Sequence, residues 1–185
     1  MRKITVCNGK GGSGKTTATI LLGLALVEAG HKAKVLDIDP QNTASRWITD
    51  GGLPLGSDDT SATVLVDTPP RLDTPELSES IRESDIIIVV SSPSPADLFT
   101  SQDTARLIGE LGAIGKTRLL FNQVQEGTIL SRGLEDTARR IGLQPLNSVL
   151  TRRQCYQHAV LLGWNALPPK AKEEVFKMAL EVASL

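Results

Sequence analysis

A glycine-rich stretch near the start of the chain has the residue types and spacing of a phosphate-binding loop. Gly9, Gly14, Lys15 and Thr16 match the pattern G-x-x-x-x-G-K-[ST]. In such a loop the backbone N–H groups point at a phosphate, Lys15 reaches the β- and γ-phosphates, and the Thr16 hydroxyl binds Mg²⁺. A turn that binds nothing is the alternative, but the strand expected before the loop and the helix expected after it favour phosphate binding. The predicted nucleotide contacts are Gly11, Gly12, Ser13, Gly14, Lys15, Thr16 and Thr17.

Three aspartates follow apolar segments that are typical of strands. Asp37 and Asp39 lie at the end of one such segment, and Asp67 at the end of the next. Two carboxylates two residues apart on a strand point to the same side. One can hold a Mg²⁺-bound water and the other can orient an attacking water. An aspartate directly after an apolar strand, as at Asp67, is the pattern that positions Mg²⁺ through water. Taken alone, the Asp37–Asp39 stretch could equally be an acidic turn closed by a proline.

Strands and helices alternate along the chain, and this order determines where the motifs lie. It predicts an α/β fold, a mostly parallel twisted β-sheet with helices on both faces, in one P-loop NTPase domain of residues 1–185. Right-handed crossovers then bring the motifs to one edge of the sheet. The expected strands cover residues 3–7, 33–38, 63–66, 85–91, 118–121 and 147–150. The expected helices cover 15–29, 43–49, 75–84, 96–111, 130–141, 151–162 and 170–184, and a polar loop is expected over 50–61.

Composition limits the classes of function. The chain has 185 residues, of which 40% are hydrophobic and 3% aromatic, so aliphatic side chains must fill the core. The formal net charge of −1 gives no general attraction to nucleic acid, and any DNA contact needs a local patch. Cys7 and Cys155 form no disulfide framework, and Cys7 is expected in the core. We see no signal peptide or transmembrane run and expect a cytoplasmic protein.

Four short motifs together resemble the ParA/MinD family of ATPases. Lys10 precedes Lys15 by five positions in Lys-Gly-Gly-Ser-Gly-Lys-Thr-Thr, which is similar to the deviant phosphate loop of that family. The segments 37–41 (Asp-Ile-Asp-Pro-Gln) and 67–70 (Asp-Thr-Pro-Pro) resemble its second motif and its second switch. Pro-Ser-Pro at 93–95 resembles small plasmid-partition ATPases. Without the resemblance, a solvated surface lysine is an equally good interpretation of Lys10.

The resemblance implies a function and a role for several residues. It implies ATP and Mg²⁺ as cofactors and a homodimer with ATP sandwiched at its interface, in which Lys10 touches the nucleotide of the partner subunit. It assigns Asp39 to hydrolysis, which leaves Asp37 with Thr16 and Asp67 at the metal, and Asn122 to the adenine base. An asparagine in a turn is nearly as good an interpretation of Asn122. It also implies non-specific DNA binding, association with the nucleoid, and a small adaptor protein (ParB-like or other) that links the ATPase to a plasmid or another cargo.

The basic side chains of the C-terminal third are the candidate DNA contacts. They are Arg132, Arg139, Arg140, Arg152, Arg153, Lys170, Lys172 and Lys177. Several of them on one face of a dimer would bind duplex DNA with a steep salt dependence. The adjacent pair Arg152 and Arg153 is the preferred candidate because the two are expected to open a helix. A solvated surface is the equal alternative. Because strand 1 begins at the start of the sequence, we expect no N-terminal helix-turn-helix.

Two other classes of protein share the expected scaffold. A membrane-cycling ATPase of the MinD type ends in a basic amphipathic helix, whereas the last helix here carries Glu173, Glu174 and Glu181. Anionic membranes should repel these glutamates, so no membrane partner is expected. A metabolic ATP-dependent enzyme would need a substrate pocket built from added loops, and this compact chain has few residues for one. An iron–sulfur ATPase would need paired cysteines, which Cys7 and Cys155 do not supply.

Overall fold

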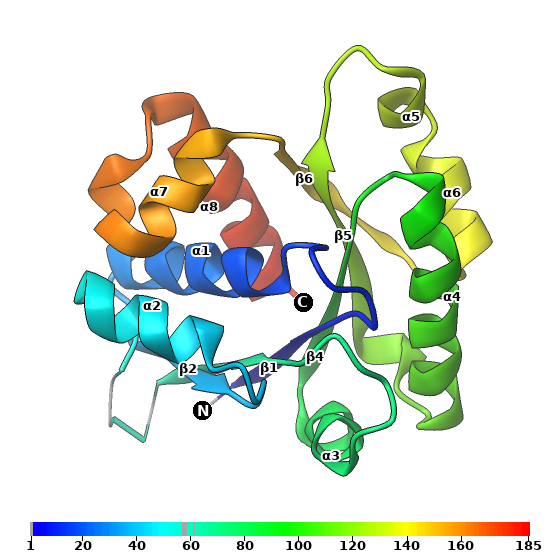
Figure 1. The fold of residues 1–185 in the computed structure, drawn as a ribbon, viewed down its shortest axis with the longest axis horizontal. Coiled ribbons are helices and arrows are strands. Elements are labelled where there is room, and N and C mark those ends of the chain that lie inside the picture. Colours follow the sequence, from blue (N-terminus) through cyan, green and yellow to red (C-terminus); the bar gives the residue numbers. More distant parts are fainter. Residues whose placement is uncertain (1, 57–58, 61) are drawn as a thin grey trace.

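The computed structural model describes residues 2–56, 59–60 and 62–185, which form an α/β fold around one parallel sheet (Figure 1). The sheet has six strands in the order β2-β3-β1-β4-β5-β6, and all neighbouring pairs are parallel. The strands are β1 (Lys3–Cys7), β2 (Ala33–Asp37), β3 (Thr63–Asp67), β4 (Ile86–Ser91), β5 (Thr117–Val124) and β6 (Pro145–Thr151). The predicted fold class is therefore confirmed.

Helices cover both faces of the sheet, each over its own aliphatic core (Figure 1). One face carries α1 (Lys15–Glu28), α2 (Thr43–Gly51), α7 (Gln154–Leu162) and α8 (Pro169–Ala183). The other face carries α3 (Pro75–Glu83), α4 (Pro95–Glu110) and α6 (Leu134–Ile141). The short helix α5 (Ile129–Arg132) follows β5. Burial of β4 between the two layers explains its apolar run from Ile86 to Val90, and β1 is buried from Ile4 to Cys7.

Strand register brings the sequence motifs to one point of the sheet edge. Val6 of β1 and Asp37 of β2 are both register partners of Asp67 in β3. The glycine-rich loop leaves β1 directly after Cys7, which is fully buried as expected. Burial raises the pKa of the Cys7 thiol to about 12, so this side chain acts as a small core hydrophobe.

The second half of the chain departs from the prediction in its element boundaries. The helix expected over 130–141 is two helices, α5 and α6, because the helical conformation is interrupted at Gly133. Thr128 begins α5 by accepting a hydrogen bond from the Ser131 amide at 3.1 Å. The two strands predicted over 118–121 and 147–150 extend further at both ends as β5 and β6.

The loop predicted to be polar is anchored by two apolar side chains. Leu53 and Leu55 lie in the core, and Gly56 forms a β-bridge with Lys34. Spacing alone gave no sign of this burial, because glycines and prolines surround both leucines. Ser57, Asp58 and Ser61, which the prediction included in this loop, lie outside the described residues.

Candidate functional site

The glycine-rich loop adopts a conformation that only glycine supports at two positions. Gly12 and Gly14 have φ of +78° and +91°. A Cβ atom on Gly14 would also lie 2.0 Å from Asn122 Nδ2, which leaves no room for any side chain. Lys15 then begins α1, so the helix N-terminus points its N–H groups at the space above the loop. This is the strand–loop–helix context predicted for a phosphate site.

Lys15 lies across the loop that it follows. Its Nζ donates to the Lys10 carbonyl oxygen at 2.9 Å, and the side chain is buried. Burial lowers the pKa of Lys15, while the nearby negative charge of Asp67 opposes that change. A buried ammonium group at the loop can neutralise the charge of a bound polyphosphate.

Two side chains at the end of β5 donate hydrogen bonds to carbonyl groups of the loop. Asn122 Nδ2 donates to the Ser13 carbonyl at 2.9 Å, and Gln123 Nε2 donates to the Gly12 carbonyl at 3.0 Å. Asn122 is 5% exposed, so its amide group supports the loop. The predicted adenine contact of Asn122 stays a prediction, and the same side chain lines a cavity beside the loop. Gln123 was not predicted, and its only local sign is a positive φ of +56°, which no sequence pattern reveals.

Polar side chains of α4 accept hydrogen bonds from the first residues of the loop. Asn8 Nδ2 donates to the Val90 carbonyl at 2.8 Å and to Ser101 Oγ at 3.1 Å, and the Gly9 amide donates to Thr104 Oγ1 at 3.2 Å. The side chains of Ser101 and Thr104 are fully buried. Their spacing with Asp97 along α4 was the available signal, but polar residues at helical spacing usually indicate a solvated face.

Asp67 and Thr16 form the corner that fits Mg²⁺. Thr16 Oγ1 donates to Asp67 Oδ2 at 2.7 Å, and Thr19 Oγ1 donates to Asp67 Oδ1 at 3.3 Å. Burial raises the pKa of Asp67 to about 6, which the hydrogen bond from Thr16 partly opposes. A buried carboxylate with hydroxyl neighbours offers the hard oxygen ligands that Mg²⁺ prefers. Among the described residues no group of three His, Cys, Asp or Glu could hold a metal ion alone, so water and phosphate oxygens would complete the set.

Asp37 and Asp39 do not share one face of a strand, so that part of the prediction was wrong. The strand ends at Asp37, whose Oδ1 accepts from the Asp39 amide at 3.0 Å and whose Oδ2 accepts from the Ser45 amide at 2.9 Å. Asp39 lies in the following turn and accepts from the Gln41 amide at 3.0 Å. The predicted roles of Asp37 at the metal and Asp39 in hydrolysis stay predictions. Asp37 is nevertheless close enough to Asp67 for its charge to raise the Asp67 pKa.

Lys10 is neither a freely solvated lysine nor directed away from its own subunit. Its Nζ lies 2.5 Å from Asp97 Oδ1, and its side chain is 33% exposed. The Asp97 side chain is 6% exposed and comes from the first turn of α4. The cross-subunit role of Lys10 stays a prediction, and the structure adds an intramolecular partner that sequence spacing did not indicate.

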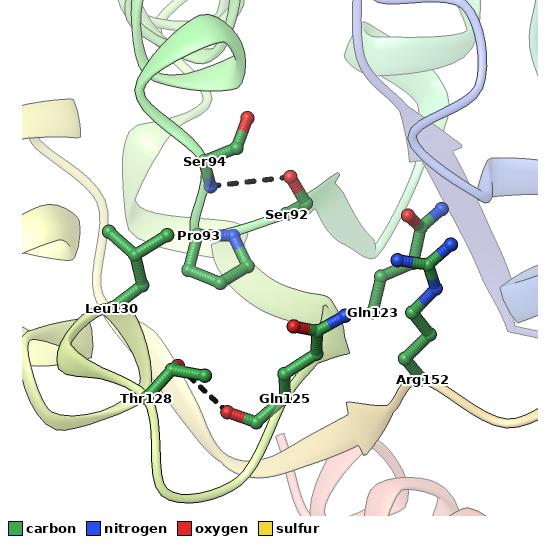
Figure 2. Close-up of a pocket in the computed structure, with 8 residues that line it drawn as sticks. All are labelled: Ser92, Pro93, Ser94, Gln123, Gln125, Thr128, Leu130 and Arg152. Atoms are coloured by element: carbon green, nitrogen blue, oxygen red, sulfur yellow. Dashed lines mark hydrogen bonds between the residues drawn. The ribbon is translucent and has the colours of Figure 1, made fainter.

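Two cavities lie beside the ends of β5 and β6, and the smaller one borders the loop. One has a volume of about 150 Å³ and lies between the loop and α7; its lining includes Gly14, Thr17, Asn122, Thr151 and Tyr156. The other, of about 230 Å³, lies between the end of β4 and the segment after β5 (Figure 2). Gln123 and Arg152 line both cavities. The first cavity borders the phosphate loop at Gly14 and Thr17.

The predicted arginine pair is divided by the fold. Arg152 is exposed and lines both cavities, as Figure 2 shows for the larger one. Arg153 turns to α8, where its guanidinium donates two hydrogen bonds to Glu174. The helix begins at Gln154, so the two arginines precede α7 rather than open it. Arg152 is thus the member of the pair that presents its charge at the sheet edge.

Comparison with known proteins gives a consistent family assignment. The profile of the CobQ/CobB/MinD/ParA nucleotide binding domain matches residues 4–163. The maintenance of carboxysome distribution protein A of Halothiobacillus neapolitanus is 30% identical over 182 residues, covering 86% of this chain and 84% of that protein. The protein of the same name from Gloeobacter kilaueensis is 30% identical over 190 residues, covering 92% and 86%.

Solved structures share the whole fold at low sequence identity. A Cyanothece McdA–ATP complex superimposes with a TM-score of 0.80 at 13% identity, covering 100% of this chain and 97% of that one. A putative plasmid partition protein from Borrelia burgdorferi bound to AMPPNP superimposes with a TM-score of 0.79 at 13% identity, covering 99% and 98%.

Proposed function

The chain belongs to the CobQ/CobB/MinD/ParA nucleotide-binding family and is an ATPase of the ParA type that uses ATP and Mg²⁺, and we propose that it positions an intracellular cargo through an ATP-dependent dimer that binds DNA non-specifically. The observation that supports this proposal most is the loop itself. It carries one lysine at its end, Lys15, and a second, Lys10, that the chemistry of a single nucleotide site does not require.

The proposed reaction is an in-line phosphoryl transfer to water, and each part of it has a candidate among the described residues. Main-chain N–H groups and Lys15 hold the β- and γ-phosphates, and Thr16 with Asp67 would hold Mg²⁺, which neutralises developing charge when bound. Asp39, in the turn after β2, orients the attacking water in the proposed reaction. The loop is fixed by Asn122 and Asn8 on its two sides, so its N–H groups need little reorganisation before the reaction.

The position of the site supports the proposed dimerisation through the nucleotide. The motifs lie along one open edge of the sheet, and residues 9–12 of the loop are only partly buried or exposed. A second subunit facing this edge would bring its own Lys10 to the phosphates across the interface. ATP then acts as part of the interface, and its hydrolysis releases the subunits.

DNA binding in this proposal rests on a smaller set of cations than the sequence suggested. Half of the eight basic residues of the C-terminal third form ion pairs: Arg139 with Asp136, Arg153 with Glu174, Lys170 with Glu126, and Lys177 with Glu173. The other four have no ion pair within the described part of the chain: Arg132, Arg140, Arg152 and Lys172. These four do not share one face, because Arg140 lies on α6 and Lys172 on α8, which cover opposite faces of the sheet. The proposed DNA contact therefore rests on Arg152, doubled by a dimer.

The proposed cellular role follows from relatives whose names refer to carboxysome distribution and to partition. We propose a cytoplasmic, nucleoid-associated protein that moves a cargo over DNA with a small adaptor, ParB-like or of another kind. The membrane-cycling alternative has less support, because the apolar face of α8 packs into the core through Val175, Met178 and Val182. Within residues 2–56, 59–60 and 62–185, no helix combines the length and the apolar character needed to cross a membrane.

Binding to random-sequence duplex DNA tests this function. We expect binding with Mg²⁺–ATP but not with ADP or without nucleotide, at affinities that fall steeply with salt. Arg152→Ala should weaken binding equally for all sequences and reduce the salt slope by about 1–2, because a dimer carries two copies. Lys32→Ala is the matched control, since Lys32 precedes β2 at the opposite edge of the sheet. Nucleotide-independent binding, or none at all with ATP hydrolysis intact, would contradict the proposal.

A further inference from the structure

Lys10, which the proposed dimer needs at the nucleotide of the second subunit, forms an ion pair with Asp97 of its own subunit. Lys10 Nζ lies 2.5 Å from Asp97 Oδ1, while Asp97 Oδ2 accepts a hydrogen bond from the Ser92 amide at 3.2 Å. Both carboxylate oxygens therefore have partners, and the side chain is 6% exposed. This contact belongs to a single subunit and leaves Lys10 directed at α4.

Asp97 cannot follow Lys10 if the lysine moves away. Asp97 lies in the first turn of the long helix α4, and two turns of the same helix hold the loop through Ser101 and Thr104. The loop and the start of α4 are thus fixed relative to each other, and only the long, partly exposed Lys10 side chain is free to change position. Movement of Lys10 alone would break the pair.

Breaking the pair leaves a buried charge with a single uncharged partner. Burial alone would raise the pKa of Asp97, but the hydrogen bonds from Lys10 and Ser92 outweigh it and lower that pKa, so the carboxylate is ionised. Without Lys10 the remaining stabilisation comes from the Ser92 amide and the helix N-terminus. An uncompensated carboxylate in a mostly buried position is costly.

We propose that Asp97 retains Lys10 within its own subunit, so that the dimer forms only when Lys10 exchanges this carboxylate for phosphate oxygens of the nucleotide in the second subunit. The inference rests on the proposed ATP-sandwiched dimer. Asp97 is a positioning residue in this scheme, because it acts through Lys10 and touches no nucleotide. Each dimer requires two such exchanges, so the strength of the ion pair enters the dimerisation constant twice.

Asp97→Asn removes the charge but keeps the shape and an oxygen that can accept from Ser92. With Mg²⁺ and AMPPNP, we expect the dimer dissociation constant to fall by about tenfold for each subunit, or about a hundredfold for the dimer. Sedimentation equilibrium measures this constant. Asp103→Asn is the matched control: Asp103 lies on the same helix, is half exposed and pairs with Arg106, so its loss should leave the constant unchanged.

A second measurement follows Lys10 in the monomer, where no dimer contributes. Reductive methylation of the nucleotide-free protein, read by mass spectrometry for each lysine, should modify Lys10 several-fold faster in Asp97→Asn than in the wild type. The rate at Lys3, which pairs with Glu83, is the internal reference and should not change. The double variant Lys10→Gln with Asp97→Asn should lose the tightening, because the gain acts only through Lys10.

The outcomes separate this inference from the function on which it rests. A tighter AMPPNP dimer together with faster Lys10 methylation supports the exchange. If the wild type dimerises with AMPPNP and Asp97→Asn leaves the dimer dissociation constant unchanged or raises it, the inference is overturned and the proposed function stays intact. Unchanged methylation of Lys10 also overturns it, because the pair would then not hold the lysine in solution. Failure of every variant to dimerise with AMPPNP would contradict the proposed function, and the inference with it.

Discussion

Replacement of Glu174 by glutamine should destabilise the fold by an amount that depends on pH. Glu174 projects from α8 and accepts hydrogen bonds from the end of β6 and the start of α7. Thr151 donates through its amide at 3.2 Å and its hydroxyl at 2.8 Å, and the Tyr156 hydroxyl donates at 2.6 Å. Arg153 donates two more and forms an ion pair. One carboxylate therefore joins α8 to the wall of the smaller cavity beside the loop.

The magnitude follows from the pKa of this carboxyl group. Burial alone would raise the pKa of Glu174, but the hydrogen bonds from Arg153, Tyr156 and Thr151 outweigh it and lower the pKa from 4.5 to about 2. A carboxylate with a pKa lowered to this extent contributes on the order of 3 kcal/mol to the free energy of unfolding at neutral pH. Glu174 is 15% exposed, so screening by solvent reduces this contribution only moderately.

The sign of the pH dependence is fixed by the direction of the pKa change. Because the folded pKa lies below the unfolded value, the stabilisation is complete above pH 4.5 and is lost as the pH falls through 2. Near pH 3 about half of it should remain. Glu174→Gln carries no such group, so the difference in unfolding free energy between wild type and variant should shrink by about half between neutral pH and pH ~3.

Urea unfolding of the nucleotide-free protein at the two pH values measures this difference. Glu173→Gln is the matched control, because the neighbouring Glu173 is exposed and pairs only with Lys177; it should show no measurable change. A difference for Glu174→Gln that stays constant with pH would refute the electrostatic reasoning. If Glu174→Gln loses no more unfolding free energy than Glu173→Gln, the five hydrogen bonds of Glu174 do not hold α8 in solution.

Four further predictions concern the nucleotide site. Lys15→Ala should abolish ATP binding measured by calorimetry, and retained tight binding would contradict the phosphate-loop assignment. Asn122→Ala should weaken ATP binding by about tenfold, because the loss of one buried hydrogen bond frees the Ser13 carbonyl and loosens the loop; an unchanged affinity would show that the remaining contacts hold the loop without Asn122. Asp39→Ala should trap an ATP-bound dimer, and undiminished turnover would show that another residue orients the water. The Mg²⁺ affinity of the ATP complex should fall as the pH drops through about 6, where Asp67 becomes protonated, and a flat profile down to pH ~5 would argue against Asp67 at the metal.

The sequence was sufficient for the features that depend on local pattern. Strand 1, the glycine loop and α1 are consecutive, so the spacing of Gly9, Gly14 and Lys15 defines the phosphate site without knowledge of the fold. The order of strands and helices then places Asp67 beside the loop, because parallel strands bring their carboxyl ends to one edge. These predictions needed no side-chain partner from a distant part of the chain.

The side-chain contacts that the sequence did not reveal join residues far apart in the chain. Asn122 is 109 residues from Ser13, and Glu174 is 21 residues from Arg153, so no periodicity could reveal either contact. Nothing in the sequence around Asp97 indicates a partner for it, and only the packing of α4 on the loop makes it the partner of Lys10. The break between α5 and α6 escaped detection because the apolar spacing continues across Gly133.

The mass of the protein in each nucleotide state tests the central claim most directly. Sedimentation or light scattering should give a monomer without nucleotide and with ADP, and a dimer with Mg²⁺ and AMPPNP. Lys10→Ala should still bind the nucleotide but stay a monomer. A wild-type protein that remains a monomer in all three states while it hydrolyses ATP would contradict the account of a dimerising, DNA-bound positioning ATPase.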